Sequence, residues 1–122
     1  MARSFKTAAL AAAQAADDKK GEDIALLNIG RISPLADYML IVTANSGPHL
    51  DALETEIDKA LGNLRLRCLH HSRPRSEHWQ ALDYGGLLIH LMTEEARDFY
   101  GLDKLYHNAP PVAWQERKTQ KV

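Results

Sequence analysis

Cysteine and histidine, the side chains here most able to bind a transition metal, come together in one short stretch. Cys68 and His70 are two residues apart, so they share a face if this stretch is a strand, and His71 follows directly. A zinc site takes about four ligands, and no spacing elsewhere in the chain supplies a recognisable second pair. We therefore predict no metal ligands, and interpret Cys68 as a buried thiol with surface histidines beside it.

Ser46 lies between a predicted strand and a predicted helix, where hydrolases place a nucleophile. Its neighbours Asn45 and Gly47 do not complete the Gly-x-Ser-x-Gly pattern, and helix capping accounts for the serine. The turn also lacks the glycine-rich cradle and the lysine of a nucleotide-binding loop. No Asp-x-Asp pair lies on a strand, so two-metal chemistry has no visible ligands. The sequence thus predicts no catalytic and no cofactor-binding residues.

Arginines form the basic cluster of the chain. A phosphate-contacting patch is one interpretation. The formal net charge of −1 and the scarcity of aromatic residues between the arginines favour a solvated strand face and loop instead. The cluster consists of Arg65, Arg67, Arg73 and Arg75.

Trp79 and Tyr84 stand out for a different reason, because tryptophan and tyrosine dominate the hot spots of binding interfaces. They frame a predicted β-hairpin whose turn contains Gly85 and Gly86. Both could equally fill the core beside Leu82. Composition alone leaves these two interpretations open.

The size and composition are those of one globular domain. The chain has 122 residues, of which 45% are hydrophobic and 25% charged. A single cysteine excludes a disulfide within the chain, which fits a reducing cytosol. No apolar run approaches the roughly 18 residues that a membrane span needs.

Hydrophobic periodicity predicts elements in the order α-β-β-α-β-β-β-α, which indicates one mixed α/β domain with a sheet of about five strands covered by helices. The clearest helix has apolar residues at spacings of three, four and four, and we assign its Glu54 and Asp58 to the solvent-exposed side. Gly21 is expected to end the first helix and Thr93 to cap the last one. The predicted helices are 4–20, 48–61 and 93–100, with one further turn near Leu105, and the predicted strands are 23–29, 38–43, 64–69, 79–83 and 87–92. We expect residues 1–111 to form the domain. Residues 112–122 are polar except for Trp114 and are expected to form a disordered tail.

Several segments, taken in order, resemble the ribosomal silencing factor family (RsfS, also called Iojap). The similarity runs from about Leu10 to Pro110, and it is the order and spacing of the segments together that make it specific. The chain departs from the family at Gly86, where an acidic residue is usual. The matching segments are Asp18-Lys19-Lys20-Gly21-Glu22-Asp23-Ile24, Ala36-Asp37-Tyr38-Met39-Leu40-Ile41, Asn45-Ser46, Trp79-x-x-Leu82-Asp83-Tyr84-Gly85, Leu87-Leu88-Ile89-His90 and Glu94-Glu95-Ala96-Arg97-x-Phe99-Tyr100-x-Leu102-x-x-Leu105.

The resemblance implies a fold similar to that of nucleotidyltransferases without their catalytic carboxylates. It implies a cytoplasmic homodimer that binds the large ribosomal subunit through ribosomal protein L-fourteen. Occupying that place would block association with the small subunit and repress translation in starvation or stationary phase. Such a factor needs no cofactor, no small-molecule substrate, no membrane and no enzymatic chemistry.

We place the expected partner-binding surface on the hairpin. Trp79 is its predicted anchor, and Asp83 the predicted partner of a basic residue on L-fourteen. Leu82 and Tyr84 are the predicted apolar contacts, and Arg97 and Tyr100 the next candidates. Two alternatives are a nucleotidyltransferase-like enzyme and a ribosomal RNA-binding module that uses the arginines. A minor contact with ribosomal RNA is compatible with the first interpretation.

Overall fold

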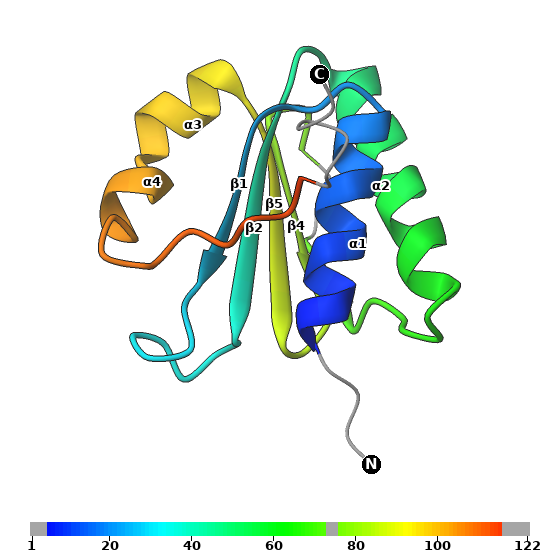
Figure 1. The fold of residues 1–122 in the computed structure, drawn as a ribbon. Helices are drawn as coiled ribbons and strands as arrows, with labels where there is room; N and C mark the ends of the chain where they lie inside the picture. The colour runs from blue at the N-terminus through cyan, green and yellow to red at the C-terminus, as the bar shows by residue number, and fades with distance from the viewer. Residues whose placement is uncertain (1–4, 73–75, 116–122) are drawn as a thin grey trace, which may run out of the picture.

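A five-stranded mixed sheet forms the centre of the fold in the computed structural model, which describes residues 5–72 and 76–115 (Figure 1). The strand order is β1-β2-β5-β4-β3. β2 and β5 pair in parallel, and the other neighbours pair antiparallel. The prediction of a mixed sheet covered by helices is confirmed. The strands are β1 (Glu22–Asn28), β2 (Tyr38–Ala44), β3 (His70–His71), β4 (Trp79–Asp83) and β5 (Leu87–Thr93).

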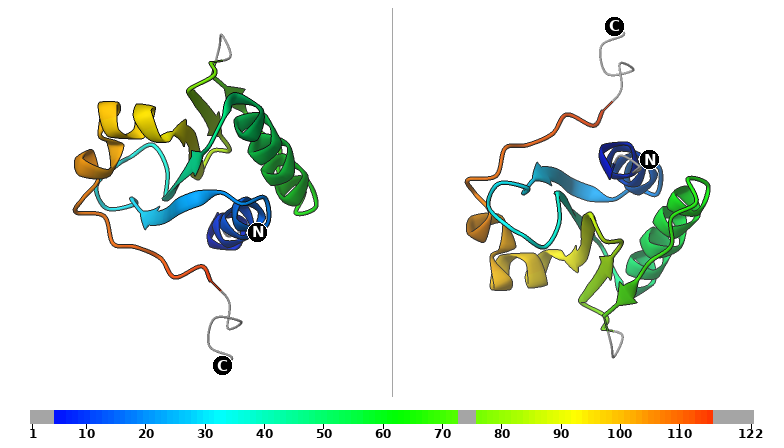
Figure 2. Two further views of the ribbon diagram at one scale, coloured as in Figure 1. Left: turned by 90° about the horizontal axis from the view of Figure 1, so that it is seen from above. Right: turned by 90° about the horizontal axis from the view of Figure 1, so that it is seen from below.

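Helices α1 (Phe5–Asp18) and α2 (Gly47–Gly62) lie side by side on one face of the sheet (Figures 1 and 2). The buried side of α1 consists of alanines, so its backbone approaches its neighbours closely. α2 buries the predicted apolar stripe Leu50, Leu53, Ile57 and Leu61 against β2 and β5. This layer holds the larger of the two hydrophobic clusters.

The predicted cap of α2 is confirmed, whereas the role of Gly21 differs from the prediction. The Ser46 side chain accepts a hydrogen bond from the His49 backbone N–H at 3.2 Å. After α1, the left-handed conformation that ends helices belongs to Lys20, with φ of 64°. Gly21 is needed for space instead, because a Cβ there would lie 2.5 Å from Val42 Cγ1.

The predicted strand 64–69 is wrong. Arg65 adopts a left-handed φ of 65°, which interrupts an extended chain. Pairing with β4 begins only at Leu69, whose N–H donates to the Asp83 carbonyl at 2.7 Å, and the strand itself is β3. The alternation that suggested a strand is nevertheless real, because Leu64, Leu66 and Cys68 pack against the core. Side chains therefore alternate between partly buried and exposed at 64–68, although no strand of the described residues pairs with the backbone of this stretch.

The second face of the sheet is covered only in part. Helices α3 (Glu94–Tyr100) and α4 (Leu102–Leu105) follow β5, and α3 packs back over β5 and β2 (Figure 2). Thr93 caps α3 as predicted, and Gly101, with φ of 61°, separates the two helices. The residues buried in this layer lie on β2, at the end of β5, on α3 and α4, and in the segments next to β1, β2 and α4: Ile29, Ala36, Met39, Ile41, Met92, Ala96, Leu102 and Ala109.

The chain then crosses the outer edge of β1 and reaches the opposite layer (Figure 1). Asn28 N–H donates to the Pro110 carbonyl at 2.9 Å, and Val112 N–H donates to the Leu26 carbonyl at 2.8 Å. Val112 and Trp114 pack against the cluster beneath α1. The described part of the expected tail, 112–115, is thus attached to the domain, and 116–122 lie outside the described residues.

Candidate protein-binding surface

Strand register assigns the predicted hairpin residues to opposite faces of the sheet. Trp79 pairs with Met92 and Asp83 pairs with Leu88, and these side chains lie on the α3 face. Leu82 and Tyr84 belong to the cluster on the α1 and α2 face. Only 2% of Leu82 and 3% of Tyr84 is exposed, so either could touch a partner only if the hairpin opened.

On the α3 face of the sheet, this helix packs over β2 and the end of β5. Within the described residues no helix packs over the remainder of the face, whose side chains are all partly or fully exposed. Its neighbours beneath α3, such as Met39, Ile41 and Met92, are buried. We call this surface the open half-face. It consists of His70, Ser72, Trp79, Ala81, Asp83, Leu88 and His90.

Three aromatic rings border the open half-face where it meets α3. The Trp79 and Tyr100 ring centroids are 4.6 Å apart, and the Tyr100 and Phe99 centroids are 4.9 Å apart in an edge-to-face arrangement. Tyr100 is 56% exposed and Phe99 is 81% exposed. Large aromatic side chains left in solvent beside an uncovered sheet are typical of an interaction surface.

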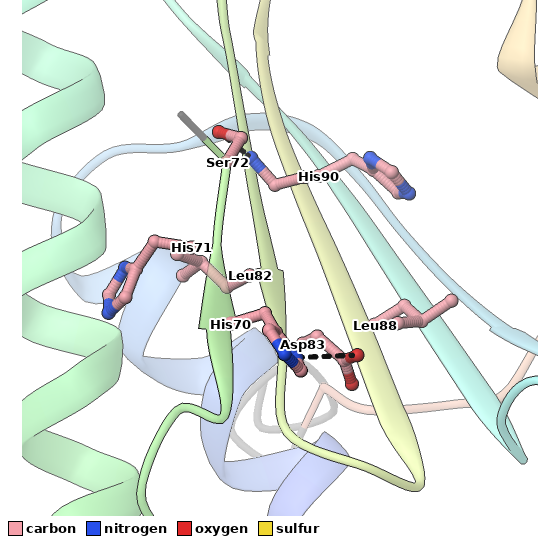
Figure 3. A pocket seen from close by; sticks show the side chains of 8 residues that line it. His70, His71, Ser72, Leu82, Asp83, Leu88 and His90 are labelled. Atoms are coloured by element: carbon pink, nitrogen blue, oxygen red, sulfur yellow. Dashed lines mark hydrogen bonds and ion pairs between the residues drawn. The ribbon is translucent and has the colours of Figure 1, made fainter. Parts of the chain in front are cut away.

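A cavity of about 230 Å³ opens on the same surface (Figure 3). Leu88 and His90 point away from α2 there, whereas His71 points toward it. Asp83 lies at the cavity with 40% of its side chain exposed, and one of its oxygens is 3.7 Å from His70 Nδ1. Its other oxygen accepts the Gly85 N–H at 2.8 Å, which fixes the turn. The lining residues are His70, His71, Ser72, Ala81, Leu82, Asp83, Leu88 and His90.

Burial changes the protonation of His90. Loss of solvent lowers the pKa of its imidazole from 6.5 to about 4, so the ring is neutral near pH 7. The Trp79 indole N–H donates to His90 Nδ1 at 3.0 Å. The open half-face is therefore uncharged at its centre and carries a carboxylate at Asp83.

Three acidic residues of α2 hold β3, β4 and the start of the turn from behind. Gln80 Nε2 donates to Asp51 Oδ1 at 3.1 Å, and Tyr84 Oη donates to Asp58 Oδ1 at 2.7 Å. His71 Nδ1 lies 3.0 Å from Glu54 Oε2. We call these three pairs the polar seam.

The structure corrects the assignment of Glu54 to the solvent-exposed side of α2 and confirms that of Asp58. Glu54 is buried, whereas Asp58 is exposed and accepts a hydrogen bond from a buried tyrosine. Burial and the hydrogen bond to Asp58 raise the pKa of the Tyr84 phenol, which keeps it a proton donor. A signal was present in the sequence, because Asp51, Glu54 and Asp58 are spaced by three and four residues and so share one side of the helix.

Arg97 is engaged within the chain. Its Nη1 donates to the Asp23 carbonyl at 2.6 Å and to Thr43 Oγ1 at 2.8 Å. Its Nε and Nη2 donate to the two carboxylate oxygens of Asp103 at 2.9 and 3.0 Å, which lowers the Asp103 pKa. Only 12% of the side chain is exposed. Arg97 therefore fixes α3 and α4 to β1 and β2.

The residues considered above for metal or phosphate binding differ in their surroundings. The Cys68 thiol donates to the His70 carbonyl at 3.1 Å, and burial raises its pKa. Within residues 5–72 and 76–115, no group of three or more His, Cys, Asp or Glu side chains could hold a metal ion. Arg65 and Arg67 are exposed, and Arg73 and Arg75 lie outside the described residues. No helix in the described part of the chain is long and apolar enough to cross a membrane.

A family model and two similar proteins indicate the same family for this chain. The family model described as "Ribosomal silencing factor during starvation" matches residues 2–122. The chain is 32% identical over 101 residues to the ribosomal silencing factor RsfS of Halalkalibacterium halodurans, covering 83% of this chain and 86% of that protein. It is 33% identical over 99 residues to RsfS of Bacillus subtilis, covering 81% and 84%.

Two solved structures share the fold. A protein of Bacillus halodurans superposes with a TM-score of 0.74 at 28% identity, over 90% of this chain and 99% of that one. A protein of Chromobacterium violaceum superposes with a TM-score of 0.81 at 24% identity, over 86% and 88%. At that identity the second likeness concerns the fold alone.

Proposed function

The chain belongs to the ribosomal silencing factor (RsfS) family, and from this premise we propose that it represses translation by binding the large ribosomal subunit. The proposed contact is ribosomal protein L-fourteen, and the proposed effect is a steric block to the small subunit, used in starvation or stationary phase. The protein would act in the cytoplasm, as a homodimer when free, and without enzymatic chemistry.

The observation that carries this proposal is the open half-face with its aromatic border. Trp79 and Tyr100 offer the rigid aromatic surface that interface hot spots use, next to a cavity that can take an apolar side chain. Asp83 offers a carboxylate to a basic residue on L-fourteen. Leu82, Tyr84 and Arg97 contribute from within, since they hold these elements in place.

The proposal is tested by pelleting purified large subunits with the protein and by measuring subunit joining in light scattering. Trp79→Ala should weaken binding by about 2 kcal/mol or more, which is roughly a thirtyfold loss of affinity, and should relieve the block to joining. Tyr100→Ala should act in the same direction, because the Tyr100 ring is more than half exposed. Thr55→Ala, on the exposed side of α2, is the control and should leave affinity unchanged.

Binding assays with purified L-fourteen and with naked ribosomal RNA distinguish a protein contact from an RNA contact on the large subunit. A protein-mediated interface requires that L-fourteen alone binds the chain and competes with large subunits. An RNA-binding module would instead bind naked ribosomal RNA with an affinity that falls steeply with salt. Equal binding of wild-type protein and folded Trp79→Ala to large subunits would contradict the proposed surface.

A further inference from the structure

The indole of Trp79 is held from two sides by different elements. Tyr100 of α3 stacks on it at a centroid distance of 4.6 Å and an interplanar angle of 49°. His90 of β5 accepts its N–H at 3.0 Å, with the two rings 5.7 Å apart. A partly exposed tryptophan in such a setting has little rotational freedom, so it meets a partner without losing side-chain entropy.

The hydrogen bond requires a particular form of His90. An indole N–H can only donate, so the Nδ1 atom of His90 must carry a lone pair and the ring proton must be on Nε2. Burial supplies this condition, because it disfavours the imidazolium and keeps the ring neutral near pH 7. His90 also lines the cavity of the open half-face, so the same imidazole ring both contacts Trp79 and forms part of the cavity wall.

We infer that His90 is a positioning residue for recognition, whose Nδ1 lone pair fixes the Trp79 indole in the orientation that meets the partner. The inference rests on the proposed function, since it assigns a role within the proposed surface. His90 lies one strand away from Trp79 and acts through it, so its effect on binding must disappear when Trp79 is absent.

The test compares replacements that keep or remove an acceptor at the δ position. His90→Asn places Oδ1 near the position of Nδ1, whereas His90→Leu keeps similar volume without an acceptor. His90→Leu should weaken binding to purified large subunits about fivefold, the equivalent of one hydrogen bond, and His90→Asn should restore affinity to within about twofold. If His90→Leu does not fold, His90→Gln replaces it, because the glutamine amide reaches the Nε2 position and leaves the indole unpaired.

Two further readouts separate positioning from general stability. The indole N–H resonance of Trp79 should move on loss of the acceptor and return in His90→Asn, with Trp114, in the opposite layer, as the reference in the same spectrum. In a Trp79→Ala background, His90→Leu should change affinity by less than about twofold, because the coupling between the two sites is then removed.

Folded His90→Leu or His90→Gln with unchanged affinity would overturn the inference, provided that Trp79→Ala weakens binding. A loss of affinity that persists at full size in the Trp79→Ala background would also overturn it, since His90 would then act independently of Trp79. If Trp79→Ala itself leaves binding unchanged, the proposed surface fails, and the recognition role of His90 fails with it.

Discussion

Tyr84 and Trp79 show how one hairpin divides its aromatic side chains between two tasks. The Tyr84 phenol reaches back to Asp58 and is buried, while the Trp79 ring lies on the other face beside exposed Tyr100. Both were candidates for the same surface from sequence alone. Their separation follows from the alternation of side chains along β4, continued into the turn.

Gly86 illustrates a constraint that only a neighbouring side chain explains. A Cβ at position 86 would meet the Phe5 ring at the start of α1, and no unusual backbone angle is involved. The ring therefore occupies the space that a side chain larger than that of glycine would need at position 86.

Gly86→Ala should lower the free energy of unfolding by about 1–2 kcal/mol, because the added methyl group forces the Phe5 ring aside. Urea denaturation measures this change. In a Phe5→Ala background the same substitution should have little effect, since the opposing ring is gone. Gly62→Ala is the matched control, because nothing lies within 4 Å of its added Cβ, and it should be neutral or slightly stabilising.

His90 should also make stability depend on pH. Its folded-state pKa, about 4, lies below the ordinary 6.5, so between these values the unfolded chain binds a proton that the folded chain does not. Stability from this group is therefore complete above pH 6.5 and is lost as the pH falls to about 4, by on the order of 3 kcal/mol. Urea denaturation at pH 7 and at pH 4.5 should show a smaller difference for His90→Asn than for wild type. An equal difference in the two proteins would contradict this assignment.

At the scale of elements, the first residues of α2 and α3 were predictable because their capping signals are local. Ser46 and Thr93 cap their helices through backbone N–H groups three residues away. The conformation of 64–69 was not predictable, because an alternation of apolar and polar residues indicates a strand whether or not another strand lies beside it. The placement of α3 was not predictable either, since it depends on Arg97 reaching Asp23, which is 74 residues distant.

Arg97→Lys should lower the free energy of unfolding by about 2 kcal/mol, although the charge is kept. A lysine cannot make the paired hydrogen bonds to Asp103 and also reach Asp23 and Thr43. Thermal and urea denaturation give the measurement. The same change at exposed Arg67 is the control and should alter stability by less than about 0.5 kcal/mol. Equal effects at the two positions would show that the network around Arg97 contributes nothing specific.

At the scale of the whole molecule, unequal coverage of the sheet defines the candidate surface. α1 and α2 cover one face, and α3 covers the β2 and β5 side of the other, which leaves β3 and most of β4 without a helix over them among the described residues (Figure 2). The polar seam attaches β3, β4 and the hairpin turn to α2 on one face of the sheet. These strands can therefore present side chains on the other face, where no helix in the described part of the chain packs over them.

Ala81→Arg should fill the cavity of the open half-face and reduce the affinity for large subunits at least tenfold. This loss corresponds to about 1.4 kcal/mol of binding free energy. An arginine is the informative replacement, because its charge favours unspecific attraction to ribosomal RNA and so opposes the expected loss. Thr55→Arg places the same charge on the exposed side of α2 and should leave affinity equal or slightly higher. Losses of similar size in both variants would place the contact elsewhere.

Features that depend on near neighbours could be predicted from the amino-acid sequence. The order of helices and strands, the caps at Ser46 and Thr93 and the hairpin turn at Gly85 all follow from local hydrogen bonding, backbone freedom and periodicity. The family followed as well, from the order of short segments. These signals need no knowledge of what lies across the sheet.

Which side chains are available to a partner depends on contacts across the whole fold. Leu82 and Arg97 have residue types that suit an interface, yet each is enclosed by elements distant in the sequence. Trp79 remains partly exposed because α3 packs mainly over β5 and β2 and reaches β4 through the Tyr100 ring. Exposure depends on the packing of whole elements, and burial of apolar surface by those elements, not local propensity, determines that packing.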